Sequence, residues 1–161
     1  MRARFIAPVL LFVALSVPTC QPAAEPIEND VAAIQGMVKA YHAAAEVSDV
    51  AGLVALRTDD VVQYPPDGPV SRGKQALEEF YTGIFEHSSF SATWPVEGTE
   101  EIVVADGWAF YISEFILTIT PKAGGGPFED RGKIIILCEK QPDGSWLWAH
   151  EIWNRNSPPS T

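Results

Sequence analysis

The residues with the clearest chemical potential lie in one short run near the end of the chain, SWLWAHEIWN, from Ser145 to Asn154. If this run is a strand, side chains alternate between its faces. One face then carries Leu147, Ala149, Glu151 and Trp153, and the other carries Trp146, Trp148, His150 and Ile152. Both faces are largely apolar, so the strand must be covered on both sides. Glu151 is therefore either a buried functional acid or one member of a buried ion pair.

The first nineteen residues have the pattern of a secretory signal peptide. Arg2 and Arg4 precede an apolar run of thirteen residues, FIAPVLLFVALSV, which is too short to span a bilayer. We therefore expect export, to the periplasmic side or the cell surface. The following Cys20 fits a degenerate bacterial lipobox, which predicts a lipid anchor to a membrane through Cys20. The alternative is ordinary cleavage near Ala23 or Ala24.

Charge and composition exclude several classes of partner. Without the two leader arginines, nine basic residues face twenty-one acidic ones, a formal charge of −12 that disfavours nucleic acid. The three histidines are dispersed and show no metal-binding spacing, so we expect no metal. The glycine run at 124–126 lacks the Lys and Ser/Thr of a phosphate loop. We expect no cofactor.

The elements that must position these residues can be read from changes in hydrophobic period. With 161 residues and 47% hydrophobic content, one domain is expected. Residues 20–29 read as a linker and 157–161 as a disordered tail. Helices are predicted from Asp30 to Ala45, from Ser48 to Leu56 and from Gly73 to Glu86. Strands are predicted at 61–64, 90–97, 102–120 with a break at 106–107, 128–140 and 146–154. This order predicts an α+β fold, a cone of three N-terminal helices wrapped by a curved, mainly antiparallel sheet, with a pocket at its open end.

Two segments resemble a known family. The run AYHAAAEVSDVAGLVALRTDDVVQYPPDG looks like the opening of the ketosteroid isomerase and SnoaL-like branch of the nuclear transport factor 2-like superfamily. The closing DGSWLWAHEIWN is similar to the ending of uncharacterised bacterial members. The resemblance covers residues 30–156, which implies one SnoaL-like domain. Its scaffold hosts isomerases, cyclases, dehydratases, hydrolases and binding modules, so it implies a fold more than a reaction.

The resemblance also implies positions for the isomerase groups, which are a base aspartate, a tyrosine and a protonated aspartic acid. The tyrosine falls on Tyr41, the base on Tyr64 and the protonated acid on Ile136. Two of the three groups are changed, so we do not expect steroid isomerisation by that mechanism. Tyr64 could still donate a hydrogen bond to a carbonyl or ether oxygen. The alternative for Tyr41 and Tyr64 is core packing.

The same alignment, with strand alternation, implies which side chains face the pocket. The expected inward residues are Phe110, Ile112, Glu114, Ile116, Ile134, Ile136, Cys138, Ala149, Glu151 and Trp153. Burial among apolar groups favours the neutral form of a carboxylic acid, which suits a general acid or base near neutral pH. Glu114 and Glu151 would lie roughly 10 Å apart and flank a ligand, with Trp153 and Asn154 shaping the site. The alternative is that each acid is neutralised by a base such as Arg57, Arg131 or Lys133.

The outward residues suggest self-association. They are Phe115, Leu117, Ile119, Ile135, Leu137, Trp148 and Ile152. No predicted helix remains to cover this apolar face, so we expect a homodimer packed sheet to sheet, as is common in the family that the chain resembles.

Three functions are then compatible with the sequence. The first is an acid/base enzyme of isomerase, cyclase or dehydratase type, acting on a small apolar molecule through Glu151, Glu114 and Tyr64, with Tyr41, Trp153, Asn154, Ile112 and Ile136 binding the ligand. The second is a non-catalytic ligand-binding module with the same pocket. The third is a structural dimer whose cavity is filled by its own side chains.

Overall fold

The computed structural model describes residues 27–156. The elements are α1 (Ile27–Glu46), α2 (Val50–Ala55), β1 (Arg57–Tyr64), β2 (Ser71–Arg72), α3 (Gly73–His87), β3 (Ser88–Thr93), β4 (Glu101–Ala105), β5 (Trp108–Pro121), β6 (Phe128–Lys140) and β7 (Trp146–Arg155). The predicted signal peptide, the lipid site at Cys20 and the tail at 157–161 lie outside the described residues. Between residues 27 and 156, no helix is both long and apolar enough to cross a membrane.

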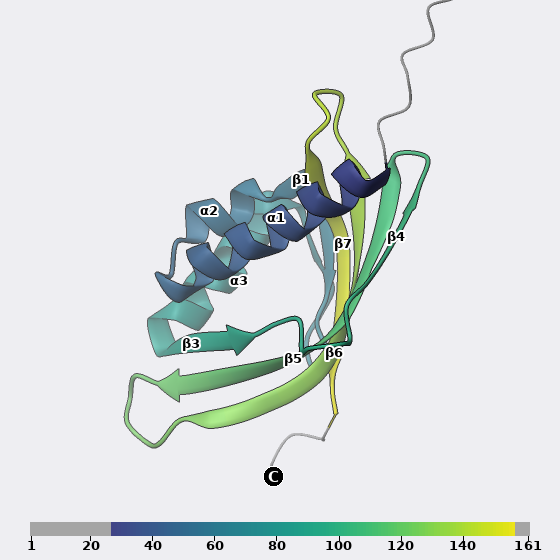
Figure 1. Cartoon of the computed structure of the whole chain (residues 1–161). Helices are drawn as coiled ribbons and strands as arrows, with labels where there is room; N and C mark the ends of the chain where they lie inside the picture. The colour runs from purple at the N-terminus through teal and green to yellow at the C-terminus, as the bar shows by residue number, and fades with distance from the viewer. Residues whose placement is uncertain (1–26, 157–161) are drawn as a thin grey trace, which may run out of the picture.

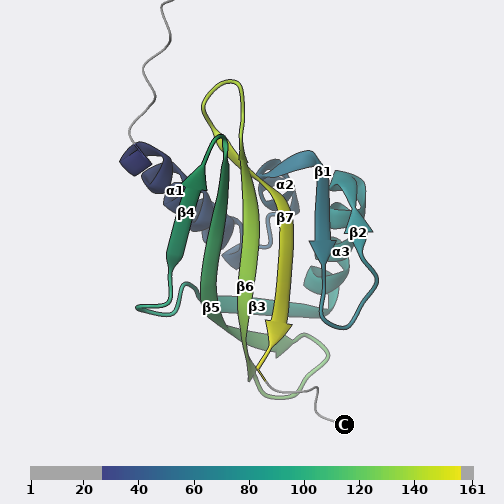
Figure 2. The same ribbon diagram turned by 90° about the vertical axis from the view of Figure 1, so that its right-hand side faces the viewer.

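One strongly curved sheet wraps around the three helices (Figure 1). Its strand order is β2-β1-β7-β6-β5-β3, and β4 also pairs with β5. Every strand pair is antiparallel except β1 with β7. The helices lie behind the sheet when its outer face is viewed (Figure 2). The predicted α+β cone is confirmed.

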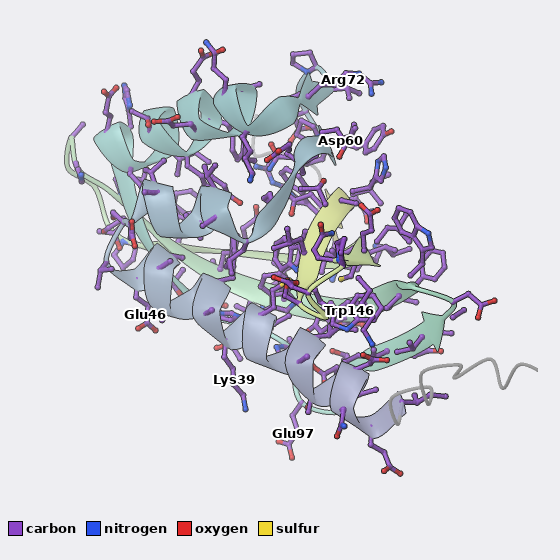
Figure 3. The ribbon with its side chains drawn as sticks, turned by 90° about the horizontal axis from the view of Figure 1, so that it is seen from above. Lys39, Glu46, Asp60, Arg72, Glu97 and Trp146 are labelled. Carbon is purple, nitrogen blue, oxygen red and sulfur yellow. The ribbon has the colours of Figure 1, made fainter. Side chains whose placement is uncertain are left out.

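Helix α1 starts at Ile27, inside the segment expected to be a linker, and its apolar stripe packs against the sheet. Ile34 and Val38 are buried on that stripe. Near its start, Asp30 accepts hydrogen bonds from Lys140 Nζ at 2.7 Å and Trp146 Nε1 at 3.0 Å. Lys39 and Glu46 lie on the outer side of α1, away from these contacts (Figure 3). The helix is thus fixed to the β6–β7 hairpin by both apolar and polar contacts.

Strand β1 is longer than the sequence indicated, and it begins almost directly after α2. Asp49 caps α2 by accepting a hydrogen bond from the Gly52 backbone N–H at 2.9 Å. The segment 58–60, which precedes the predicted strand at 61–64, already belongs to β1. This early start places Arg57 at the first position of the strand, opposite Trp148 of β7.

A β-bulge explains why both faces of β7 look apolar. Cys138 pairs with Trp148 and Leu137 with His150, so Ala149 is the extra residue. Before the bulge the even-numbered side chains point inward, and Trp148 is fully buried. After the bulge the odd-numbered side chains point inward, and Glu151 is 4% exposed. The predicted outward position of Trp148 is therefore wrong.

The prediction of which β5 side chains point inward is wrong as well. Ala109, Tyr111, Ser113 and Phe115 are the buried residues, while Phe110 and Glu114 are exposed. Apolar residues stand on both faces of this strand, so alternation alone does not fix its phase. The inward position of Phe115 matches the glycine opposite it. Gly132 on β6 pairs with Phe115, and a side chain at Gly132 would collide with the Phe115 ring.

The outer sheet face remains apolar but has a different composition. Phe115, Leu117, Ile119 and Trp148 face the interior, contrary to the expectation. Besides Phe128 at the start of β6, the exposed large apolar residues on β4 to β7 are Val103, Trp108, Phe110, Ile135 and Ile152. The register aligns Phe110 with Val103 and Leu137, and Ile135 with Ile112 and Ile152. We call Val103, Trp108, Phe110, Ile135 and Ile152 the outer apolar patch.

Candidate functional site

A cavity of about 590 Å³ lies between the concave sheet and the helices. Its walls come from α1, α3, the loop after β1, and the inward faces of β5, β6 and β7. The apolar and aromatic lining residues are Tyr41, Phe80, Tyr81, Ile84, Trp94, Phe115, Leu117, Ile119, Ile134 and Trp153, with Pro65, Pro66 and Pro69 in the loop. The polar lining residues are Gln63, Asp67, Ser71, His87, Ser88, Asp130, Glu151 and Arg155.

The buried end of the cavity carries a carboxylate fixed by an amide. Gln63 donates a hydrogen bond from Nε2 to Glu151 Oε1 at 2.6 Å. The amide oxygen of Gln63 accepts a hydrogen bond from Ser71 Oγ at 3.3 Å. Gln63 and Glu151 are 2% and 4% exposed. Because the parallel β1–β7 pairing places Gln63 opposite Glu151, the sheet itself sets this contact.

Arg57 supplies the counter-charge from behind Glu151. Its Nη2 lies 3.6 Å from Glu151 Oε2, an ion pair too long to be a hydrogen bond. Arg57 also donates to Tyr81 Oη at 3.0 Å and to the Leu53 carbonyl at 3.3 Å. Its guanidinium centre lies 3.7 Å from the centroid of a Trp148 ring. Arg57 is fully buried and does not line the cavity.

Two tyrosines complete this end of the site. Burial, and to a lesser extent the nearby charge of Glu151, raises the pKa of Tyr41. Burial also raises the pKa of Tyr81 well above its ordinary value. Both hydroxyls therefore stay protonated at neutral pH and act as hydrogen-bond donors instead of bases. Tyr41 is stacked on Trp148 with ring centroids 5.0 Å apart, which fixes its orientation.

The opposite end of the cavity is a rim of charged groups. Arg155 donates from Nε to Asp130 Oδ2 at 2.7 Å and from Nη1 to Asp67 Oδ2 at 2.5 Å. Asp67 belongs to the proline-rich loop and Asp130 to β6, so Arg155 of β7 ties the loop to β6. The side chains of Arg155 and Asp67 are 37% and 50% exposed.

The structure brings together only some of the residues singled out in the sequence. Glu151, Tyr41 and Trp153 line the cavity. Ile136 is fully buried in the core without lining the cavity. The alternative raised for Glu151 also applies, since it does pair with Arg57.

The remaining candidates lie elsewhere. Glu114 and Asn154 are exposed, and Ile112 is half-buried on the outer face. Glu114 therefore cannot flank a ligand together with Glu151, because β5 has the opposite phase from the one expected. Tyr64 is half-buried, does not line the cavity, and stacks with His150 at 6.4 Å. Its neighbour Gln63 takes the inward position on β1.

Sequence reasoning missed Gln63, Ser71 and Tyr81 as members of the polar cluster. A signal existed for Gln63, which is the one amide in the apolar run Val61–Tyr64 and so a candidate buried polar group. Ser71 and Tyr81 gave no local signal, because only the docking of β2 and α3 on β1 brings them to the site. In the described part of the chain, no group of three or more His, Cys, Asp or Glu side chains is arranged to hold a metal ion.

Known structures share this architecture. A ketosteroid isomerase-like protein from Erwinia carotovora atroseptica is 30% identical, with a TM-score of 0.69 over 80% of this chain and 98% of that one. A nuclear transport factor 2-like superfamily protein from Salmonella enterica is 16% identical, with a TM-score of 0.74 over 84% and 96%. A cystatin-like fold protein from Nostoc punctiforme is 12% identical, with a TM-score of 0.63 over 80% and 92%. The last two show the fold alone. None of the curated proteins is a match.

The family model for the SnoaL-like domain matches residues 38–136, which is more than half of the chain. That range includes Tyr41, Arg57 and Gln63 on the helical and β1 side of the cavity, and it ends before β7. The Erwinia protein extends the likeness over most of the described residues. The chain therefore belongs to the SnoaL-like family, in the ketosteroid isomerase-like branch of the nuclear transport factor 2-like superfamily.

Proposed function

We propose that this protein is an exported binding protein for small, largely apolar molecules, and that Glu151 gives its site the capacity for proton transfer. The observation that carries the proposal is a cavity of about 590 Å³ with a 4%-exposed carboxylate at its inner end. This volume lies within the range typical of ligand pockets. An open cavity of that size argues against a purely structural module filled by its own side chains.

The lining supports binding of an apolar body. Phe80 and Trp153 meet edge to face with centroids 6.3 Å apart, and Phe115 and Ile134 cover the sheet side. Burying apolar ligand surface against such walls gains about 25 cal/mol for each Å² removed from water. The few polar groups at the two ends would then fix the orientation of the ligand.

Catalysis is the finer part of the proposal. Glu151 can accept a proton, while Tyr41 can donate a hydrogen bond to an oxygen on the same molecule. This pair would serve an isomerase, cyclase or dehydratase. Once a ligand is known, Glu151→Gln should abolish turnover and spare affinity. Unchanged turnover would remove Glu151 from the mechanism and leave a non-catalytic binding module.

Export and assembly are also proposals. The pattern of residues 1–19 and Cys20 supports export with a lipid anchor, so that a negatively charged domain stands away from the membrane on its linker. The outer apolar patch supports a homodimer through the sheet, since its five large side chains are each at least 40% exposed.

Titration of the mature protein with Nile red, a neutral apolar dye, tests ligand binding. We expect saturable binding with one dye for each chain. Ile84→Trp, which fills the cavity from α3, should weaken it about tenfold or more. Thr82→Trp adds the same side chain to the exposed face of α3 and should leave binding unchanged. Equal binding to both variants would place the dye outside the cavity and refute the proposal.

A further inference from the structure

Among the described residues, the buried end of the cavity offers a ligand a carboxylate but no cation. Glu151 lines the cavity, whereas the guanidinium of Arg57 lies behind it against Trp148. A ligand that reaches this end therefore meets Glu151 directly. A ligand carboxylate or phosphate would approach a like charge there, and only the neutral hydroxyls of Tyr41 and Tyr81 would offset its desolvation.

Glu151 also has unused hydrogen-bonding capacity. An ionised carboxylate offers about four lone-pair sites. Within the described residues Gln63 occupies one, and Arg57 at 3.6 Å makes an ion pair without a hydrogen bond. The amide group of Gln63 is itself engaged by Ser71. The free capacity of Glu151 is thus that of an acceptor, and it calls for a ligand that donates.

The charge balance favours a neutral donor over a cationic one. Arg57 already offsets the charge of Glu151, so an ammonium group would bring an unbalanced positive charge into a buried site. At the rim, both Asp67 and Asp130 are engaged by Arg155. That arrangement also means that the charge of Arg155 is already offset by two carboxylates before an anionic ligand could reach it. A hydroxyl group meets the requirements at the buried end without adding charge.

The strand geometry fixes where the rest of the ligand lies. Glu151, Trp153 and Arg155 share one face of β7, and four residues of strand span about 13 Å. A hydroxyl at Glu151 would therefore place the body of the molecule against Trp153, Phe80 and the inward residues of β5 and β6. The ligand would end at the charged rim.

We propose that the cavity selects a neutral, predominantly apolar or aromatic molecule that carries a hydroxyl group and donates it to Glu151. This inference rests on the proposed ligand-binding function and adds the chemical class of the ligand. It distinguishes a hydroxylated molecule from its ether, which cannot donate, and from its carboxylate, which is charged.

Three matched probes test the inference on the unaltered mature protein by isothermal titration calorimetry. They are 4-phenylphenol, 4-methoxybiphenyl and biphenyl-4-carboxylate. We expect the phenol to bind about tenfold or more tightly than the ether, as befits a hydrogen bond to a charged acceptor, and the carboxylate to bind most weakly. Equal affinities, or a preference for the ether or the carboxylate, would overturn the inference while leaving apolar binding intact. If neither these probes nor Nile red bound, the proposed function would fail as well.

A matched pair of variants locates the recognition. Glu151→Gln removes the charged acceptor and presents an amide that can also donate, so the phenol-to-ether preference should shrink to a few-fold. Glu114→Gln makes the same change on the exposed face of the sheet and should keep the full preference. A preference lost in both variants, or kept in both, would contradict recognition by Glu151. Thermal melts check that each variant folds, and the three probes on the unaltered protein decide the question even if Glu151→Gln does not fold.

Discussion

Replacing Arg57 by methionine is the most informative perturbation of stability, because Arg57 is a fully buried cation whose partner is also buried. Its side chain is 0% exposed and that of Glu151 is 5% exposed. Arg57→Met keeps an apolar side chain of similar length over Trp148. Among the described residues it leaves Gln63 as the one hydrogen-bonding partner of Glu151 and removes the counter-charge. Breaking a buried pair from one side costs about 3–5 kcal/mol.

The expected change is large enough to measure by two methods. At about 3–4 °C for each kcal/mol in a domain of this size, the midpoint of thermal unfolding should fall by about 10–20 °C. Urea titration should show the same loss in the free energy of unfolding, with little change in its dependence on urea concentration. Arg131→Met is the matched control. Arg131 pairs with Glu129 at 2.7 Å, but the two side chains are 57% and 54% exposed, so its loss should cost less than about 1 kcal/mol.

A double variant separates loss of charge balance from loss of packing. Arg57→Met with Glu151→Gln removes both charges, and the new amide oxygen can still accept the hydrogen bond from Gln63. If the unpaired carboxylate is the main cost, the double variant should be more stable than Arg57→Met alone by about 2 kcal/mol. The reasoning is refuted if the two changes simply add, or if Arg57→Met lies within about 1 kcal/mol of the unaltered protein.

Three further predictions concern other parts of the molecule. Light scattering of the domain without its leader should give a dimer mass at micromolar concentration. Ile135→Glu places a charge in the outer apolar patch and should give a monomer mass. Lys133→Glu changes an outward residue at the edge of that patch and should still give a dimer mass. The Lys140 ammonium beside Asp30 holds the pKa of that carboxyl below its usual value, so this pair stabilises the fold above about pH 4 and is lost as the pH falls further. Asp30→Asn should thus flatten the decline of the melting temperature between pH 5 and pH 3, and an unchanged decline would refute this. Mass spectrometry of the mature N-terminus should find lipid on Cys20, and an unmodified chain that starts beyond Cys20 would contradict it.

The fold was accessible from the sequence because its local periods are clear. The predicted helices from Asp30 to Ala45 and from Ser48 to Leu56 and the predicted break at 106–107 each agree with the structure. Which side chains of each strand face the interior was harder to predict from the sequence. The bulge at Ala149 moves both Trp148 and Glu151 to the interior, and a strict period of two cannot represent an extra residue. On β5, apolar side chains stand on both faces, so the inward face was assigned from the alignment with the family. That assignment placed Glu114 inside.

The polar end of the site was only partly accessible for a different reason. Arg57 was one of three bases considered as a partner for the buried acids, and nothing in its local sequence selects it. The choice depends on the parallel pairing of β1 with β7, a contact between distant segments that no local pattern encodes. Gln63 and Tyr81 likewise acquire their roles from the packing of β1 against β7 and α3.

The parallel pairing of β1 with β7 has a consequence for the order in which the protein can be made. Gln63 and Glu151 are 88 residues apart, and β7 is the last strand among residues 27–156. A nascent chain that has reached Gly144 contains α1, α2 and α3 but leaves β1 and β6 with open edges at the centre of the future sheet. Contacts of such long range slow folding, and open edges favour aggregation. Chains truncated before Trp146 should therefore aggregate, since one late strand closes the sheet and supplies the carboxylate of the site.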